Sequence, residues 1–79
     1  MSVAVEVEQF IVREIAPGVD SIDHGLDLLA SEVIDSLGIV QLIAFLEEKY
    51  GIKVKDDDLD PENFRSVEEI ASFVEQKGA

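Results

Sequence analysis

Hydrophobic residues recur at helical spacing in three segments of the chain. The first segment repeats apolar side chains every three or four positions, at Val3, Val7, Phe10, Ile11 and Ile15. This period predicts an amphipathic helix of three to four turns. Val3, Val5 and Val7 also alternate as a strand would, but no later segment offers a partner strand. We predict that the helix ends at Pro17 and Gly18, because proline disfavours the helical region for its predecessor and glycine accepts the backbone angles of a chain reversal.

The strongest period lies in "SLGIVQLIAFLEEKYG", residues 36–51. One broad apolar face is predicted to hold Leu37, Val40, Ile43, Ala44 and Tyr50, and it is widened by Ile39, Leu42, Phe45 and Leu46. The clearly solvent-facing residues are Gln41, Glu47, Glu48 and Lys49. So wide an apolar surface predicts a central helix buried between the other helices. Gly51 after Tyr50 is the expected stop.

The last periodic segment begins with "SVEE", in which Ser66 and Glu69 fit a capping box. Apolar residues follow at core spacing at Val67, Ile70, Ala71 and Val74, with Phe73 beside them. Before this helix, Asp60 and Pro61 suit the cap and the first position of a short helical turn.

The connection "VDSIDHGLDLLASEVID", residues 19–35, has no sustained period but is too apolar for a free linker. Loops of this length are usually functional or closely packed. We expect it to fold back onto the core through Ile22, Leu26, Leu28, Leu29, Val33 and Ile34. The predicted fold class is all-α: a small helical bundle of three main helices plus one short helix, with a long loop between the first and second helices. Residues 1–79 are predicted to form one domain, because a chain of this size cannot hold a second core.

Composition and charge narrow the function. Hydrophobic residues make up 47% of the chain, which is enough to fold rather than stay disordered. Eighteen acidic and six basic residues give a net charge of −12, which excludes nucleic acid as a partner because phosphate contacts need Lys and Arg. No apolar run approaches the length of a membrane span, and "MSVAVEVEQF" lacks the features of a secretory leader. With no cysteine to form a disulfide, we expect a soluble, cytoplasmic monomer stabilised by packing.

Candidate chemistry centres on "VIDSLGIV", residues 33–40, where Ser36 stands at the start of the second predicted helix. On local grounds alone, Asp35 or Ser36 could be an ordinary helix N-cap. Catalysis by Ser36 is not expected, because the only histidine, His24, lies in the long loop, where a solvated or capping side chain is the simplest expectation. We therefore predict no catalytic residues and no enzymatic activity.

The acidic run "DDDLDPENFRSVEE" invites comparison with a calcium loop. Its acids would fill loop positions one, three, five and twelve with Asp58, Asp60, Glu62 and Glu69. The glycine required at position six is Asn63, however, and Pro61 with a predicted helix start lies inside the loop. We predict no metal site and interpret the run as a solvated surface.

Several features together resemble the acyl carrier protein family. They are "DSL" at residues 35–37 heading a hydrophobic helix, an acidic chain of about eighty residues, the long loop before that helix, and the "DPENF" turn before a capped last helix. The resemblance is closer to carriers of amino acids or other acids outside housekeeping fatty-acid synthesis, including D-alanyl carrier proteins and peptidyl carrier domains. It implies that Ser36 carries a 4′-phosphopantetheine arm in phosphodiester linkage, and that the thiol of this arm holds an acyl or aminoacyl group as a thioester.

The resemblance also implies roles for neighbouring residues. Asp35 would help the modifying transferase and its Mg²⁺ engage the site, and Leu37 would be an exposed contact for partner enzymes. Val40 and Gln41 of the same helix are further candidates for partner binding. A surface on which the arm or its cargo rests would be lined by Val40, Ile43, Ile52 and Phe64, although core packing is an alternative role for these four.

The implied partners are a phosphopantetheinyl transferase, a ligase or acyltransferase that loads the cargo, and a downstream synthase or transferase. Fatty-acid-synthase carriers usually have acids just after the serine and three residues later, where this chain has Gly38 and Gln41. This departure disfavours a housekeeping fatty-acid role. "DSLG" with "VQL" is similar to the D-alanyl carriers, and the "LGGxS" run typical of peptidyl carrier domains is absent. The alternative function is an unmodified acidic helical adaptor that binds a basic partner protein.

Overall fold

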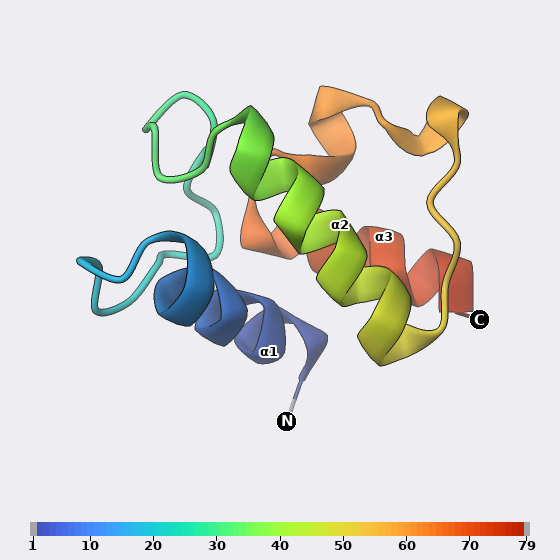
Figure 1. Ribbon diagram of the computed structural model, residues 1–79, viewed down its shortest axis with the longest axis horizontal. Coiled ribbons are helices and arrows are strands. Elements are labelled where there is room, and N and C mark those ends of the chain that lie inside the picture. Colours follow the sequence, from blue (N-terminus) through green and yellow to red (C-terminus); the bar gives the residue numbers. More distant parts are fainter. Residues whose placement is uncertain (1, 79) are drawn as a thin grey trace.

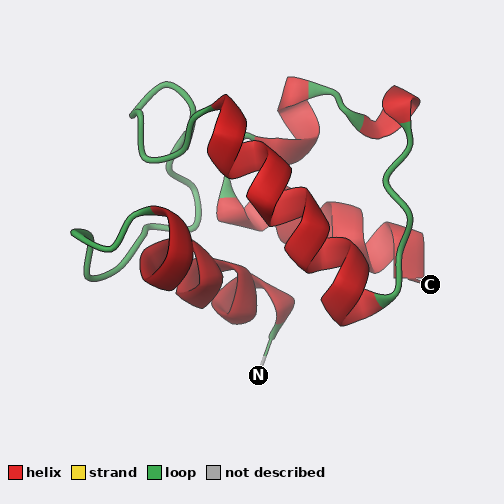
Figure 2. Ribbon diagram, in the orientation of Figure 1, coloured by secondary structure: helices red, strands yellow, loops and turns green. Residues whose placement is uncertain are grey.

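The computed structural model describes residues 2–78, and its regular elements are all helical (Figure 2). The three main helices are α1 (Val3–Phe10), α2 (Ser36–Tyr50) and α3 (Val67–Gly78). A π-helical turn, η1 (Ile11–Ile15), extends α1, and two 3₁₀ turns, η2 (Asp56–Asp58) and η3 (Pro61–Phe64), precede α3. The predicted all-α class, with three main helices and a long first loop, is confirmed.

Figure 1 shows α2 crossing in front of α3, with α1 beside them. The long loop of residues 16–35 lies on one side of the molecule, and the connection that holds η2 and η3 lies on the other. α1 packs chiefly against α3. The core between these elements is built from Val7, Ile11, Ile22, Leu28, Ile34, Leu42, Leu46, Ile52, Phe64, Val67, Ile70, Phe73 and Val74.

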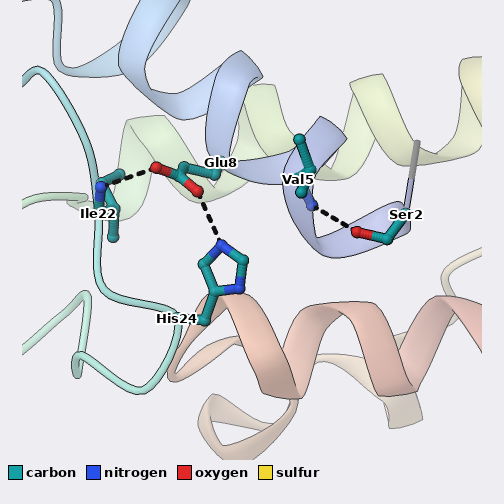
Figure 3. Close-up of polar contacts among 5 residues, drawn as sticks. All are labelled: Ser2, Val5, Glu8, Ile22 and His24. Atoms are coloured by element: carbon teal, nitrogen blue, oxygen red, sulfur yellow. Dashed lines mark hydrogen bonds and ion pairs between the residues drawn. The ribbon is translucent and has the colours of Figure 1, made fainter.

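The first helix follows its apolar period, with Val7 and Ile11 fully buried. The Ser2 hydroxyl caps it by accepting the N–H of Val5 at 3.2 Å (Figure 3). Its last turn is wider than an α-helix, because the N–H of Ala16 donates to the carbonyl of Ile11, five residues earlier, at 2.7 Å. The helical turn ends at Ile15, just before the turn at Pro17 and Gly18, as predicted, although Gly18 does not adopt a positive φ there.

The prediction that α2 is buried between other helices is wrong for one of its faces. Its fully buried stripe contains Gly38, Leu42 and Leu46. Leu37 and Val40, which the period placed on the main buried face, are 66% and 63% exposed. Ala44, from the same predicted face, is also exposed. The physical reason is that the core covers one side of α2 and leaves the opposite side open to solvent.

The end of α2 is as predicted. Gly51 adopts the left-handed conformation, with φ of 66°, and its N–H donates to the carbonyl of Glu47 at 3.0 Å. Glycine reaches this conformation without the steric cost that a Cβ brings. The chain therefore leaves the helix at Gly51 and turns toward η2.

The long loop does fold back onto the core, but with only part of its predicted set. Ile22, Leu28 and Ile34 are buried, and Val33 is partly buried against the core. Leu26 and Leu29 were predicted to join them and are instead exposed. A backbone hydrogen bond explains why Leu28 is buried and Leu29 is not. The N–H of Leu28 donates to the carbonyl of Arg65 at 2.6 Å, which holds Leu28 in the core and leaves the neighbouring Leu29 side chain exposed.

The turn η3 and the helix α3 form where they were predicted. Asp60 caps η3 by accepting the N–H of Glu62 at 2.9 Å. The five predicted core residues of α3 are all buried: Val67, Ile70, Ala71, Phe73 and Val74. The Ser66 hydroxyl accepts the N–H of Glu69 at 3.2 Å. The reciprocal bond of the capping box, from the Ser66 N–H to the Glu69 side chain, does not form among residues 2–78, so the capping box is only half made.

The acidic run before α3 is more structured than a solvated surface. Asp56–Asp58 form η2, which was not predicted. Asp58 pairs with the ammonium of Lys77 at 2.6 Å and accepts the N–H of Lys55 at 3.0 Å. Lys77, and second the Lys55 N–H, hold the pKa of the Asp58 carboxyl below its usual range. The run thus links this connection to the end of α3, and within the described chain no three His, Cys, Asp or Glu side chains form a metal-binding group.

Candidate functional site

Ser36 is the first residue of α2, and its side chain is exposed. The capping role belongs to the preceding residue, because Asp35 is extended and its Oδ1 accepts the N–H of Gly38 at 2.9 Å. The Asp35 carbonyl also accepts the N–H of Ile39 at 2.9 Å. Within the described chain, no hydrogen bond engages the Ser36 hydroxyl. Because Asp35 caps the helix, the Ser36 hydroxyl is free at its first residue.

The backbone around Ser36 suits an attached phosphate. The N–H groups of Ser36 and Leu37 fall in the first turn of a fifteen-residue helix, where no intrahelical acceptor exists. Such N–H groups, with the partial positive charge of the helix N-terminus, stabilise a phosphate. The residues present therefore fit a phosphodiester on the Ser36 oxygen.

An apolar pocket of about 320 Å³ opens beside Ser36. It is formed by the end of the long loop, one face of α2 and the segment around η3, through Leu29, Ser36, Ile39, Val40, Ile43, Leu59, Asp60, Pro61 and Phe64. Three of the four residues predicted to line a resting surface are here, namely Val40, Ile43 and Phe64. The fourth, Ile52, does not line the pocket and is buried in the core. Leu29, Leu59 and Pro61 were not predicted as lining residues, because the sequence does not show which loop residues return to α2.

The described chain has five exposed large apolar side chains, Leu26, Leu29, Leu37, Val40 and Leu59, and all of these except Leu26 lie at this pocket or next to Ser36. Leu29, Val40 and Leu59 line the pocket, and Leu37 follows Ser36 directly. An exposed apolar patch on a small protein usually marks a site of interaction. The patch and the free hydroxyl thus occupy the same end of the molecule.

Gln41 is the predicted partner-binding residue that does not share this site. Its side chain is exposed, but it lines a separate concavity of about 370 Å³ together with Phe10, Glu14, Ala44, Phe45 and Glu48. Two of its lining residues, Phe10 and Phe45, are stacked with their ring centroids 4.2 Å apart. Gln41 therefore faces the groove between α1 and α2 and not the Ser36 pocket.

Removing the carboxylate of Asp35 is expected to lower the stability of the protein. Asp35→Ala leaves the Gly38 N–H without its acceptor, and loss of an N-cap of this kind costs about 1 kcal/mol. The free energy of unfolding, from urea titration followed by circular dichroism, measures the loss. Asp57→Ala is the matched control, because Asp57 is exposed and caps no helix. Equal stability of the two variants would contradict the capping role.

Comparison with known proteins places the chain in a family. The phosphopantetheine attachment site family, PP-binding, matches residues 7–74. The chain therefore belongs to this family of carrier proteins. Its members hold cargo and do not catalyse, so the chain is a carrier and not an enzyme, and its cofactor is phosphopantetheine.

Relatives and solved structures agree with this membership. An acyl carrier protein of Bdellovibrio bacteriovorus is 28% identical over 78 residues, covering 99% of this chain and 97% of that protein. One of Solidesulfovibrio magneticus is 33% identical over 79 residues, covering 98% and 96%. The structure of KstB-PCP in its apo form has a TM-score of 0.74 and 44% identity, covering 90% of this chain and 80% of that one. The solution structure of KstB-PCP in kosinostatin biosynthesis has a TM-score of 0.64 and 43% identity, covering 100% and 91%.

Two earlier expectations are settled by these findings. The predicted resemblance to the acyl carrier family is confirmed, and family membership favours a carrier over an unmodified adaptor. Carrier proteins work with partner enzymes.

Among residues 2–78, no helix is long and apolar enough to cross a membrane.

Proposed function

We propose that Ser36 accepts the 4′-phosphopantetheine arm, and that the chain shuttles an acyl or aminoacyl group between partner enzymes as a thioester on this arm. One observation carries the proposal: Ser36 combines an exposed, unengaged hydroxyl with a helix N-terminus and an adjacent apolar pocket. When attached, the arm supplies the thiol that a chain without cysteine lacks. In this attachment the Ser36 oxygen gives its proton to a base of the transferase and bonds to the phosphorus of coenzyme A that bears pantetheine. The bond from that phosphorus to the bridging oxygen breaks, and adenosine 3′,5′-bisphosphate leaves with that oxygen.

The residues around Ser36 have supporting roles in this proposal. Asp35 holds the first turn of α2 in place through its bond to Gly38, and its exposed position allows it to help a transferase place Mg²⁺. Leu37 and Val40 are apolar contacts for a phosphopantetheinyl transferase, a loading ligase or acyltransferase, and a downstream synthase or transferase. Their exposure supports this role, because nothing in the described chain covers them.

The proposed cargo belongs to specialised biosynthesis, such as that of polyketides, nonribosomal peptides or related aminoacyl products, more than to housekeeping fatty-acid synthesis. Gly38 and Gln41 replace the acids expected after the serine of a fatty-acid carrier. KstB-PCP, which is described as part of kosinostatin biosynthesis, is 43% identical to this chain over the matched residues. Both observations favour an adenylating ligase as the loading enzyme, because such ligases activate amino and other acids for carriers of this kind.

A modification assay tests the proposal. The protein is incubated with coenzyme A, Mg²⁺ and a broad-specificity phosphopantetheinyl transferase, and its mass is measured intact and after digestion. We expect one arm per chain, located on the peptide that contains Ser36. An unmodified protein, under conditions where a control carrier is fully converted, would favour the acidic adaptor instead.

Partner binding is expected to weaken as salt rises. The net charge of −12 steers the chain toward basic surfaces on its enzymes, and salt screens such attraction, with a Debye length of about 10 Å at 0.1 M. The KM of the transferase for the protein, measured between low and high salt at saturating coenzyme A, should increase several-fold. A KM that salt does not change would indicate an apolar interface around Leu37 and Val40.

A further inference from the structure

One carboxylate of α1 anchors the long loop at two points. Oε2 of Glu8 accepts the backbone N–H of Ile22 at 3.0 Å, and Oε1 pairs with Nε2 of His24 at 2.7 Å (Figure 3). The Glu8 side chain is only 20% exposed, so water competes weakly for these contacts. From its place in the loop, we expected the His24 side chain to be solvated or to cap a helix. That expectation is wrong, because the side chain pairs with Glu8. We call this three-residue contact, Glu8 with Ile22 and His24, the loop latch.

The loop is also fixed to α3, through Glu68, and to Arg65, which follows η3. The carbonyl of His24 accepts the N–H of Glu68 at 3.0 Å, and the N–H of Leu28 donates to the carbonyl of Arg65 at 2.6 Å. The N–H of Ile34 then donates to the carbonyl of Leu28 at 3.2 Å. The latch therefore begins a series of contacts that runs along the loop from α1 to the start of α2.

This series ends at the candidate site. Leu29, next to the fixed Leu28, lines the pocket beside Ser36. Ile34 is buried against Gly38 in the first turn of α2, and the following residue, Asp35, caps that turn. The position of the loop thus determines both one wall of the pocket and the entry of the chain into the helix that begins at Ser36.

We propose that Glu8 and His24 are positioning residues for the modification of Ser36, because the loop latch holds the α1–α2 loop in the arrangement that a phosphopantetheinyl transferase binds. This inference rests on the proposed function. Neither residue touches the reacting atoms. They increase the fraction of molecules in which the loop and the first turn of α2 have the arrangement that the transferase binds.

The charge state of Glu8 supports the latch. The Ile22 N–H, and second the His24 side chain, hold the pKa of the Glu8 carboxyl below its usual range. The carboxylate is therefore ionised at neutral pH, where hydrogen bonds to a charged acceptor are stronger than neutral ones. Because this pKa is lowered on folding, the latch contributes above the ordinary pKa of glutamate and is lost as the pH falls through the lowered value. The other charged groups near Glu8 are Arg13 and Asp20, which line the same surface concavity.

Loosening the latch should raise the KM of the transferase for the protein and leave its kcat unchanged. If only a fraction of the molecules is competent to bind, the apparent dissociation constant rises by the inverse of that fraction. Once bound, the Ser36 hydroxyl meets the same reacting groups. We therefore expect a higher KM of the transferase for the protein and an unchanged kcat. Because the protein is the substrate, partial unfolding would raise this KM in the same way, so the variants are compared only where they are fully folded.

Two pairs of variants test this expectation at a temperature where circular dichroism shows each to be folded. Glu8→Gln keeps the size of the side chain but removes its charge and one of its acceptor oxygens. Glu14→Gln is its matched control, because it removes the same charge from an exposed residue of η1 that makes no side-chain hydrogen bond in the described chain. His24→Ala removes the side-chain donor of the latch, and His24→Gln restores a side-chain N–H at a similar reach.

We expect Glu8→Gln and His24→Ala to raise the KM about three- to tenfold at constant kcat, and Glu14→Gln and His24→Gln to stay near wild type. Amide hydrogen exchange of Ile22, followed by NMR, should be about tenfold faster in Glu8→Gln than in Glu14→Gln. Equal KM values for these two variants, or a fall in kcat at unchanged KM, would overturn the positioning role. Unchanged Ile22 exchange would overturn the latch itself, whatever the kinetics. A wild-type chain that is never modified would instead overturn the proposed function, and this inference with it.

Discussion

Replacing Ser36 with alanine is expected to abolish attachment of phosphopantetheine, because alanine has no oxygen with which to form the phosphodiester. None of the other five serines stands unengaged at a helix N-terminus. The Ser2 hydroxyl accepts the Val5 N–H, and Ser21 and Ser31 lie within the long loop. Ser66 also stands at the start of a helix, but it is only 5% exposed and its hydroxyl already accepts the Glu69 N–H. Ser72 is exposed, but it lies within α3, away from the free N–H groups of a helix N-terminus.

Alanine at position 36 should leave the fold intact, because it is the best helix former and Asp35, not Ser36, caps α2. Mass spectrometry after incubation with coenzyme A, Mg²⁺ and transferase measures the result, and circular dichroism confirms folding. Ser72→Ala is the matched control and should be modified as fully as the wild type. An arm found on Ser36→Ala would show that another residue is the attachment site.

Replacing Gly38 with valine is expected to destabilise the protein by about 3 kcal/mol, at the upper end of the usual cost of overpacking a core. A Cβ at this position would lie 2.6 Å from Cγ1 of Ile34 and 3.1 Å from Cγ2 of Ile15. Both distances are shorter than an ordinary contact between carbon atoms, and Ile34 is buried and cannot move aside. Glycine at this position thus allows the first turn of α2 to approach both the loop and the end of η1.

Urea denaturation of Gly38→Val measures this loss. Ala44→Val is the matched control, because it introduces the same β-branched side chain at an exposed position of α2 and should cost less than about 1 kcal/mol. Since Gly38 is two residues from Ser36, we also expect slower modification of Gly38→Val at a temperature where it remains folded. If the two valine variants were equally stable, the close approach of α2 to Ile34 would be wrong.

At the start of α2, the sequence predicts the place of Ser36 but not which residue caps the helix. The position of the serine at the head of a helix, with an aspartate before it, was predicted from local pattern alone. That the aspartate would be the cap and the serine free was left open, because both side chains suit the N-cap. The geometry of Asp35 and Gly38 decides this question in the structure.

Local pattern was sufficient wherever neighbouring residues determine the structure. The five core residues of α3, the stop at Gly51 and the cap at Asp60 all depend on contacts within a few positions of the chain. Such features follow from helical periodicity and from the backbone preferences of single residues. For the same reason, the positions of the helices could be predicted without any knowledge of their packing.

Only the tertiary structure decided which apolar residues face the solvent and which loop residues reach the core. Apolar residues surround α2 so widely that their period does not select a buried side, and packing buries Leu42 and Leu46 while exposing Leu37 and Val40. The loop latch joins Glu8 to His24, sixteen positions apart, through a contact that no local period encodes. The sequence by itself therefore determined the helices and the place of the serine. The pocket and the loop that forms its wall were decided by contacts between distant segments, which depend on how the helices assemble.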